Sequence, residues 1–104
     1  MGDFTFERDC RTPYSESYLI IDNDRSLGRI ELHFTSNIVH GTLCITEDAG
    51  QEGIREIIRA VDQELVDVLG VQRQELIIHV FEGREVGIYG EHGFDQNGNG
   101  LERI

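Results

Sequence analysis

Residues 53–69 decide the fold and read GIREIIRAVDQELVDVL. Their apolar members recur at intervals of three and four, the spacing of an amphipathic α-helix, while the intervening positions are mostly charged. The apolar members are Ile54, Ile57, Ile58, Val61, Leu65, Val68 and Leu69. Such a stripe has to be covered by another part of the chain, whereas the charged side can face water. The sequence therefore predicts one long helix packed on a sheet.

The residues around this stretch suit helix ends. Asp48 is followed three residues later by Gln51, which fits a capping box at the start of the helix. Gly70 directly follows the last apolar residue and fits a left-handed C-cap.

Residues 27–46 contain two stretches in which apolar and polar residues alternate, and we interpret them as a β-hairpin. A loop with an even number of residues places Phe34 opposite Val39 and keeps the apolar side chains on one face. The same register sets His33 opposite His40 on the other face. A loop of odd length would divide the apolar pairs between the two faces, so we expect the even loop.

The N-terminal part predicts two further strands. Phe4 and Phe6 alternate with polar residues and indicate a short edge strand before a turn-like DCRTP segment at 9–13. Residues 18–21 form a second β-type run, closed by the turn-forming DNDR cluster at 22–25.

Beyond the helix, residues 75–81 are apolar at nearly every position, as expected for a central strand covered on both sides. Residues 85–91 are predicted to return alongside it across a three-residue loop with Gly83 in the left-handed conformation. The element order β-β-β-β-α-β-β defines an α+β fold, with a largely antiparallel sheet of about five or six strands and the helix packed on one face. We expect a single domain over residues 1–92 and a flexible tail rich in glycine and asparagine over residues 93–104.

One face of the predicted sheet is more apolar than a surface exposed to water. The residues that we expect on the face away from the helix, and that we predict to form an interface, are Ile77, His79, Phe81 and Tyr89. Two covers are open for this face. Either the aromatic N-terminal segment folds over it, or a protein partner or a second subunit covers it.

Composition limits the classes of partner. The 104 residues carry a formal net charge of -11, and all nine basic residues are arginine, so the chain is lysine-free. Nucleic-acid backbones and anionic membranes would repel such a chain, which favours cationic protein partners. The N-terminus lacks the pattern of a signal peptide and no apolar run has the length of a membrane span, so we expect a cytoplasmic protein.

The chain lacks the common catalytic and cofactor motifs, including the phosphate loop, GxGxxG, GxSxG, HExxH and CxxC, so no cofactor is predicted. Cys44 lies in a predicted strand and is expected to be packed, whereas Cys10 lies in the turn-like segment beside arginines, as a reactive thiol would. An alternative metal or enzyme site combines Glu31, His33 and His40 on one hairpin face.

A second alternative cation site lies in the tail, where alternate oxygen-bearing residues match the opening of a calcium loop. These residues are Asp95, Asn97 and Asn99. The glutamate expected at position twelve of such a loop would lie beyond Ile104.

The absence of a catalytic motif and the apolar second face together favour a small acidic protein that is not an enzyme. We expect it to bind a protein partner, or to form a homodimer, through the sheet face. Two alternatives stay open: an inhibitor that imitates nucleic acid, for which the acidity would be functional, and the small metal-binding protein or enzyme based on His33, His40 and Glu31.

Overall fold

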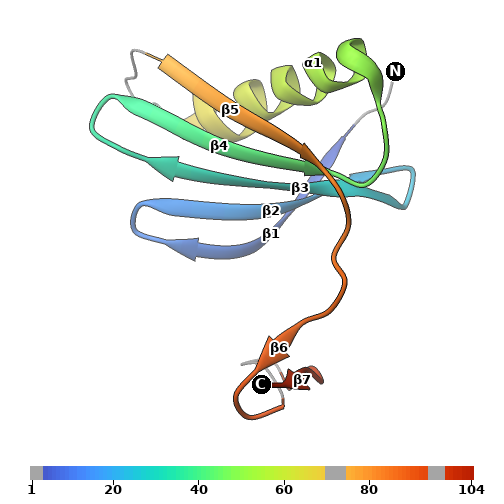
Figure 1. Ribbon diagram of the computed structural model, residues 1–104. Coiled ribbons are helices and arrows are strands. Elements are labelled where there is room, and N and C mark those ends of the chain that lie inside the picture. Colours follow the sequence, from blue (N-terminus) through green and yellow to red (C-terminus); the bar gives the residue numbers. More distant parts are fainter. Residues whose placement is uncertain (1–3, 70–74, 94–97) are drawn as a thin grey trace.

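The computed structural model describes residues 4–69, 75–93 and 98–104, and it shows a five-stranded sheet with a helix on one side (Figure 1). The sheet strands are β1 (Thr5–Thr12), β2 (Ser15–Asp22), β3 (Arg25–Phe34), β4 (Ile38–Ile45) and β5 (Glu75–Glu82). The helical segment comprises α1 (Gly50–Val61), a π-helical turn η1 (Asp62–Val66) and a 3-10 turn η2 (Asp67–Leu69). Two short strands, β6 (Tyr89–Gly90) and β7 (Glu102–Arg103), pair with each other. The predicted α+β class is confirmed.

The sheet follows the order of the chain, β1-β2-β3-β4-β5. The first four strands form an antiparallel meander, and α1 then crosses over so that β5 runs parallel to β4. Connecting two parallel strands requires such a crossover, which explains why the helix lies between β4 and β5 in the sequence. The helix covers one face of the sheet (Figure 1).

The tight turns follow local sequence rules. Asn23 and Asp24, between β2 and β3, both have positive φ angles of 50° and 66°, which a two-residue hairpin turn requires and which asparagine and aspartate tolerate. Between β3 and β4, the predicted even loop is confirmed, because Phe34 lies opposite Val39 and His33 lies opposite His40.

The helix is confirmed, but its boundaries and its buried stripe differ from the prediction. It begins at Gly50, and the capping position is Ala49, which makes no side-chain capping bond. Asp48 accepts a hydrogen bond from the Gly50 N–H at 2.8 Å, so the predicted capping box with Gln51 is wrong. Gly70 lies outside the described residues.

The π-helical turn changes which valine enters the core. In this turn a backbone N–H bonds the carbonyl five residues before it, as the Asp67 N–H does with Asp62. Val66, within this turn, is fully buried, while Val68, which follows it, is 68% exposed. The prediction that Val68 belongs to the buried stripe is therefore wrong.

The core lies between the helix and one face of the sheet. Its buried members are Ile20, Ile30, Leu32, Val39, Leu43, Ile45, Ile57, Val61, Leu65 and Val66. The aromatic residues Phe4, Phe6 and Tyr18 pack against this cluster. These aromatic residues of the N-terminal segment therefore lie on the helix side of the sheet rather than over the opposite face.

The first strand is longer than predicted. β1 continues through Asp9, Cys10 and Arg11, which were expected to form a turn. A register shift between Arg8 and Cys10 lets the strand accommodate this polar stretch as a bulge at the sheet edge. The edge position of β1 is confirmed. The predicted turn at 9–13 is shorter and later than expected, because it comprises residues 13 and 14 and includes only Pro13 of the predicted segment.

The last part of the chain differs most from the prediction. β5 is an edge strand rather than a central one, and the expected hairpin with residues 85–91 does not form. Gly83 does not take the left-handed conformation predicted for the loop, and its N–H bonds the carbonyl of Ile45 at 2.8 Å, which continues the ladder with β4. Residues 83–88 then form an extended segment, the arm, which leaves the sheet toward β6 and β7 (Figure 1).

The predicted boundary at residues 92 and 93 divides a paired unit. The Leu101 N–H bonds the carbonyl of Gly93 at 2.9 Å, and the Ile104 N–H bonds that of Gly90 at 3.1 Å. The end of the predicted tail is thus hydrogen-bonded to the segment that follows the arm. Its flexibility stays a prediction.

Candidate functional site

The sheet face opposite α1, here called the open face, is formed by every second residue of β2 to β5. Strand alternation places these side chains away from the helix, and the register arranges them in rows across β3, β4 and β5. The three rows are His33–His40–Ile77, Glu31–Thr42–His79 and Arg29–Cys44–Phe81. The described residues place no helix or further strand over this face (Figure 1).

The half of the open face over β1 to β3 is polar and centred on Arg29. One terminal nitrogen of its guanidinium, Nη2, donates to Asp9 Oδ2 at 2.8 Å and to Ser17 Oγ at 2.7 Å. Its Nε is buried and has no hydrogen-bond partner among the described residues, and Glu31 Oε2 lies 3.9 Å from it. Arg29 is therefore held between two acidic residues.

A shallow depression of about 230 Å³ lies over this polar half. Its lining residues are Asp9, Cys10, Ser15, Glu16, Ser17, Arg29, Glu31 and His33. Arg29 lies between Asp9 and Glu31 and offsets part of their negative charge, so the depression offers both hydrogen-bond donors and acceptors. It suits a polar surface of a partner better than a strongly charged small ligand.

The large exposed apolar side chains of the open face lie on β5, beside the polar residues His40, Thr42 and His79. Phe81 is 57% exposed and Ile77 is 37% exposed, and both point to the same side of β5 because they are four residues apart in a strand. His79 lies between them and is also exposed. Two large apolar side chains on one edge strand form a patch that a single copy of this chain leaves in water.

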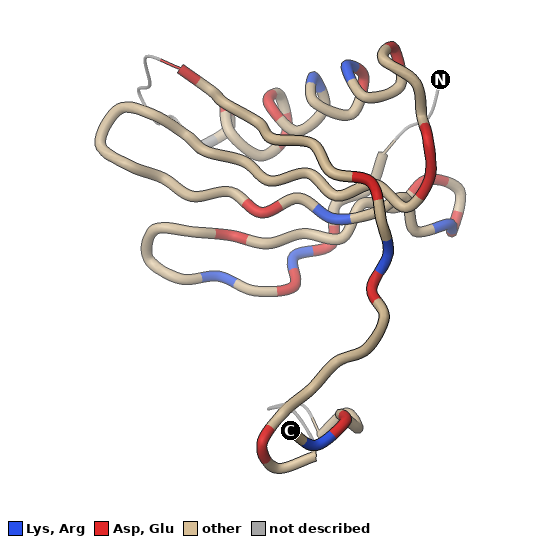
Figure 2. The backbone as a smooth tube through the Cα atoms, in the orientation of Figure 1, with Lys and Arg blue, Asp and Glu red and all other residues tan. Residues whose placement is uncertain are grey.

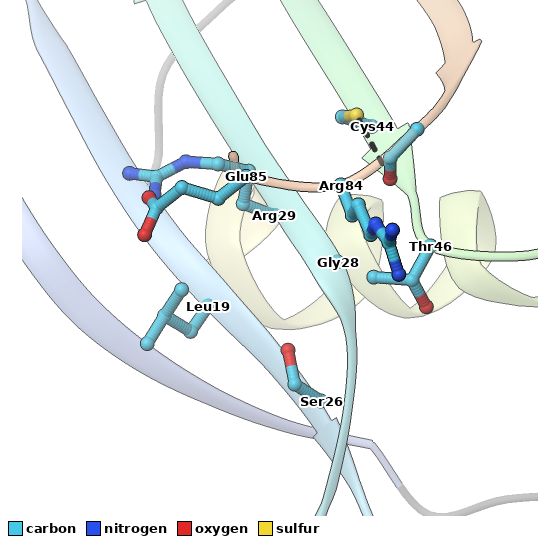
Figure 3. A pocket seen from close by; sticks show the side chains of 9 residues that line it. Leu19, Ser26, Gly28, Arg29, Cys44, Thr46, Arg84 and Glu85 are labelled. Carbon is cyan, nitrogen blue, oxygen red and sulfur yellow. Dashed lines mark hydrogen bonds between the residues drawn. The ribbon is translucent and has the colours of Figure 1, made fainter. Parts of the chain in front are cut away.

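The start of the arm and the open face border a small pocket (Figure 3). Its volume is about 160 Å³, and its lining residues are Leu19, Ser26, Gly28, Arg29, Cys44, Thr46, Gly83, Arg84 and Glu85. The Cys44 Sγ donates to the Gly83 carbonyl at 3.7 Å and attaches the arm to β4. Gly28 is required here because a Cβ at this position would lie 1.9 Å from the Cys44 carbonyl oxygen.

The predicted interface residues separate into two groups. Ile77, His79 and Phe81 lie together on the open face of β5, as expected. Tyr89 lies on β6, beyond the arm, and does not share the sheet with them. Its predicted place on this face depended on the hairpin that does not form.

The predicted metal ligands on the hairpin share one face without forming a complete site. His33 and His40 are directly opposite each other, and Glu31 lies on the same side of β3 two residues away. Within the described ranges, no three His, Cys, Asp or Glu residues gather as a metal site would require. Asp95 and Asn97 of the predicted calcium loop lie outside the described residues, whereas Asn99 lies within them.

The two cysteines occupy different surroundings, and both are reduced thiols. Cys44 is half-buried on β4, in agreement with its predicted packing. Cys10 is exposed at the bulge of β1, opposite Ser17, rather than in a loop.

One polar cluster was not predicted and lies near the start of β2. The carboxylate of Glu16, which is buried, accepts a hydrogen bond from the Tyr18 hydroxyl and lies 3.5 Å from Arg11 Nε. Burial of the phenol, reinforced by the Glu16 hydrogen bond and charge, raises the pKa of Tyr18 to about 12. The sequence signal was the spacing of Glu16 and Tyr18, two residues apart on one face of a strand.

No protein-family model, curated protein or solved structure matches this chain. Among the described residues, no helix combines the length and apolar character needed to cross a membrane.

Proposed function

We propose that this chain is a small, acidic, non-enzymatic protein-interaction module of the cytoplasm, which binds a protein through the open face. The bound protein is a different partner or a second copy of this chain. The observation that carries the proposal is the apolar patch of Ile77 and Phe81, which the N-terminal aromatic residues do not cover.

The layout of the open face fits protein recognition. Binding interfaces combine a few large apolar anchors with a polar rim, and aromatic side chains are common among the anchors. Phe81 and the pocket of about 160 Å³ supply the apolar part. Arg29 and Glu31 supply the polar part, and their mutual neutralisation lowers the cost of covering them.

Charge indicates which partners are favoured. The formal net charge of -11 attracts cationic surfaces over distances of about the Debye length, roughly 10 Å at moderate salt. A basic partner would therefore associate faster than a neutral one, and its association would slow as salt is added.

The two alternative functions gain less support. Imitation of nucleic acid calls for carboxylates in rows, but Figure 2 shows aspartate and glutamate distributed over the helix, the strands and the arm, with arginines among them. A metal site on the hairpin would need a third ligand beside His33 and His40. Neither alternative explains the exposed apolar residues of β5.

The test compares how much of a binding protein is recovered on the Phe81→Glu variant and on the unmodified chain. The substitution places a charge at the centre of the apolar patch, and recovery of a specific partner, including a tagged second copy, should fall by at least about tenfold. Val86→Glu is the matched control, because Val86 is 97% exposed on the arm and receives the same change away from the open face. Equal losses for both variants, or none for Phe81→Glu, would contradict the proposal.

A further inference from the structure

Every second residue of β5 directs its backbone N–H and C=O groups away from β4, toward the free edge of the sheet. The Gly83 N–H points to β4, since it bonds Ile45. Backbone groups alternate in direction along a strand, so the N–H and C=O groups of Leu76, Ile78 and Val80 point to the opposite side. No other strand of the described residues pairs with that side.

This edge lacks the features that usually prevent strand pairing. The other edge strand of the sheet, β1, carries Glu7, Arg8, Asp9 and Arg11 and a bulge. β5 has eight residues, and between its end residues Glu75 and Glu82 it has no Asp, Glu, Lys, Arg or Pro. Long apolar edges without charges or proline are the ones that add another strand.

The sequence of β5 is complementary to itself in the antiparallel direction. Directly opposite residues of an antiparallel pair point to the same face, so a two-fold axis perpendicular to the sheet has to pass between two copies of one residue. With His79 at the axis, Ile77 of each copy lies opposite Phe81 of the other on the open face. On the helix face, Ile78 lies opposite Val80 in the same way. This register also keeps Glu75 and Glu82 of the two copies from lying opposite each other.

We propose that the β5 edge binds the β5 edge of a second copy in this register, which joins two five-stranded sheets into one of ten strands. The two helices then lie on one side, and the two open faces lie together on the other. The inference rests on the proposed function in that the second copy is the bound protein, and it places the contact at the strand edge.

The charge of the chain supplies a signature for this contact. Two copies with a formal net charge of -11 each repel one another, whereas β5 has no Asp, Glu, Lys or Arg between its end carboxylates. Added salt screens the repulsion, so the dimer should become tighter as ionic strength rises. Binding of a cationic partner would weaken under the same change.

The first measurement is hydrogen exchange of the full chain followed by NMR at increasing protein concentration. The amides of Leu76, Ile78 and Val80 should become protected as concentration increases, by at least about tenfold in rate when most of the protein is dimeric. The amides of Ile77 and Phe81 serve as the internal control, because they already bond β4. If the amides of Leu76, Ile78 and Val80 exchange at a rate that does not depend on protein concentration, the proposal is overturned.

The second measurement is sedimentation equilibrium of Val80→Pro and Val80→Thr at low and high salt. Proline removes an outward N–H, a change that edge strands tolerate, whereas threonine keeps the N–H and the branched shape. Val80→Pro should raise the dimer dissociation constant at least about tenfold, and Val80→Thr should leave it within about threefold. If Val80→Pro does not fold, the exchange measurement on the unmodified chain still decides.

His40→Glu separates edge pairing from stacking of two open faces, because the His40 side chain lies on the open face of β4 and does not belong to the edge strand. Its dimer should be as stable as that of the unmodified chain. Loss of the dimer in His40→Glu with retention in Val80→Pro would overturn edge pairing and leave self-association through the open face standing. The unmodified chain could also be monomeric at all concentrations and still capture a partner that Phe81→Glu does not capture. That result would overturn the β5 dimer and leave the proposed binding function standing.

Discussion

The two faces of the sheet are made by the same strands, but one is buried beneath the helix and the other is open. On β4, Val39, Leu43 and Ile45 are buried beneath the helix, whereas His40 and Thr42 alternate with them on the open face. A strand turns successive side chains to opposite faces, so one sequence supplies both surfaces. The described chain has one long helix, which covers one face. The comparison shows that the surface proposed for binding is the face of the sheet over which the described residues place no helix or further strand.

The largest expected effect comes from a pair of substitutions at neighbouring residues of β4, one on each face of the sheet. Leu43→Ala should lower the free energy of unfolding by ~2–5 kcal/mol, because Leu43 is fully buried and its removal leaves a cavity. Thr42→Ala, on the open face, should change it by less than ~1 kcal/mol. Urea unfolding followed by circular dichroism measures both. Similar losses for the two variants would mean that the open face is covered in solution.

A second pair of substitutions examines the helix and the effect of its π-helical turn. Val66→Ala should cost about 2 kcal/mol, from two fewer buried carbon groups and the space they leave. Val68→Ala should stay within ~0.5 kcal/mol, because Val68 is largely exposed. The reverse order of the two losses in thermal or urea unfolding would show that a regular α-helix continues through residues 62–69.

A smaller effect is expected from the polar half of the open face. Arg29→Gln removes the ion pair between Arg29 and Asp9. Both side chains of this pair are partly exposed, so the free energy of unfolding should fall by less than ~1 kcal/mol. It should also shrink as salt is added, because salt screens exposed charges. Urea unfolding at low and high ionic strength measures it. A loss that exceeds that of Leu43→Ala would show that the polar half contributes more to stability than the core.

These comparisons also show where sequence patterns predict structure well. The β3–β4 register could be predicted because a shift by one residue would have moved Phe34 and Val39 to opposite faces. The helix could be predicted because its stripe extends over many residues. His33 and His40 were placed opposite each other for the same reason as Phe34 and Val39, so this part of the candidate site followed from the fold.

The failures share a different physical origin. Val66 and Val68 exchange places because a single π-helical turn shifts the stripe, and periodicity over a few residues does not reveal such a turn. The apolar run of β5 was interpreted as a central strand, although an edge that binds another molecule has the same composition. The position of Tyr89 was predicted wrongly because it depended on a loop with a left-handed Gly83, and Gly83 does not have a positive φ angle.

The last predicted effect is confined to alkaline pH and concerns Tyr18, on the covered side of the sheet. Its pKa is raised from 10.0 to about 12, first by burial and then by the hydrogen bond to Glu16. The folded state therefore favours the neutral phenol, and this contribution to stability is complete below pH 10 and is lost as the pH rises from 10 toward 12. The free energy of unfolding should consequently fall more steeply over that range in the unmodified chain than in Tyr18→Phe. Tyr14→Phe, which removes a phenol that is 74% exposed, should keep the slope of the unmodified chain. If the free energy of unfolding of Tyr18→Phe and of the unmodified chain falls with the same slope between pH 10 and pH 12, burial does not raise the pKa of Tyr18.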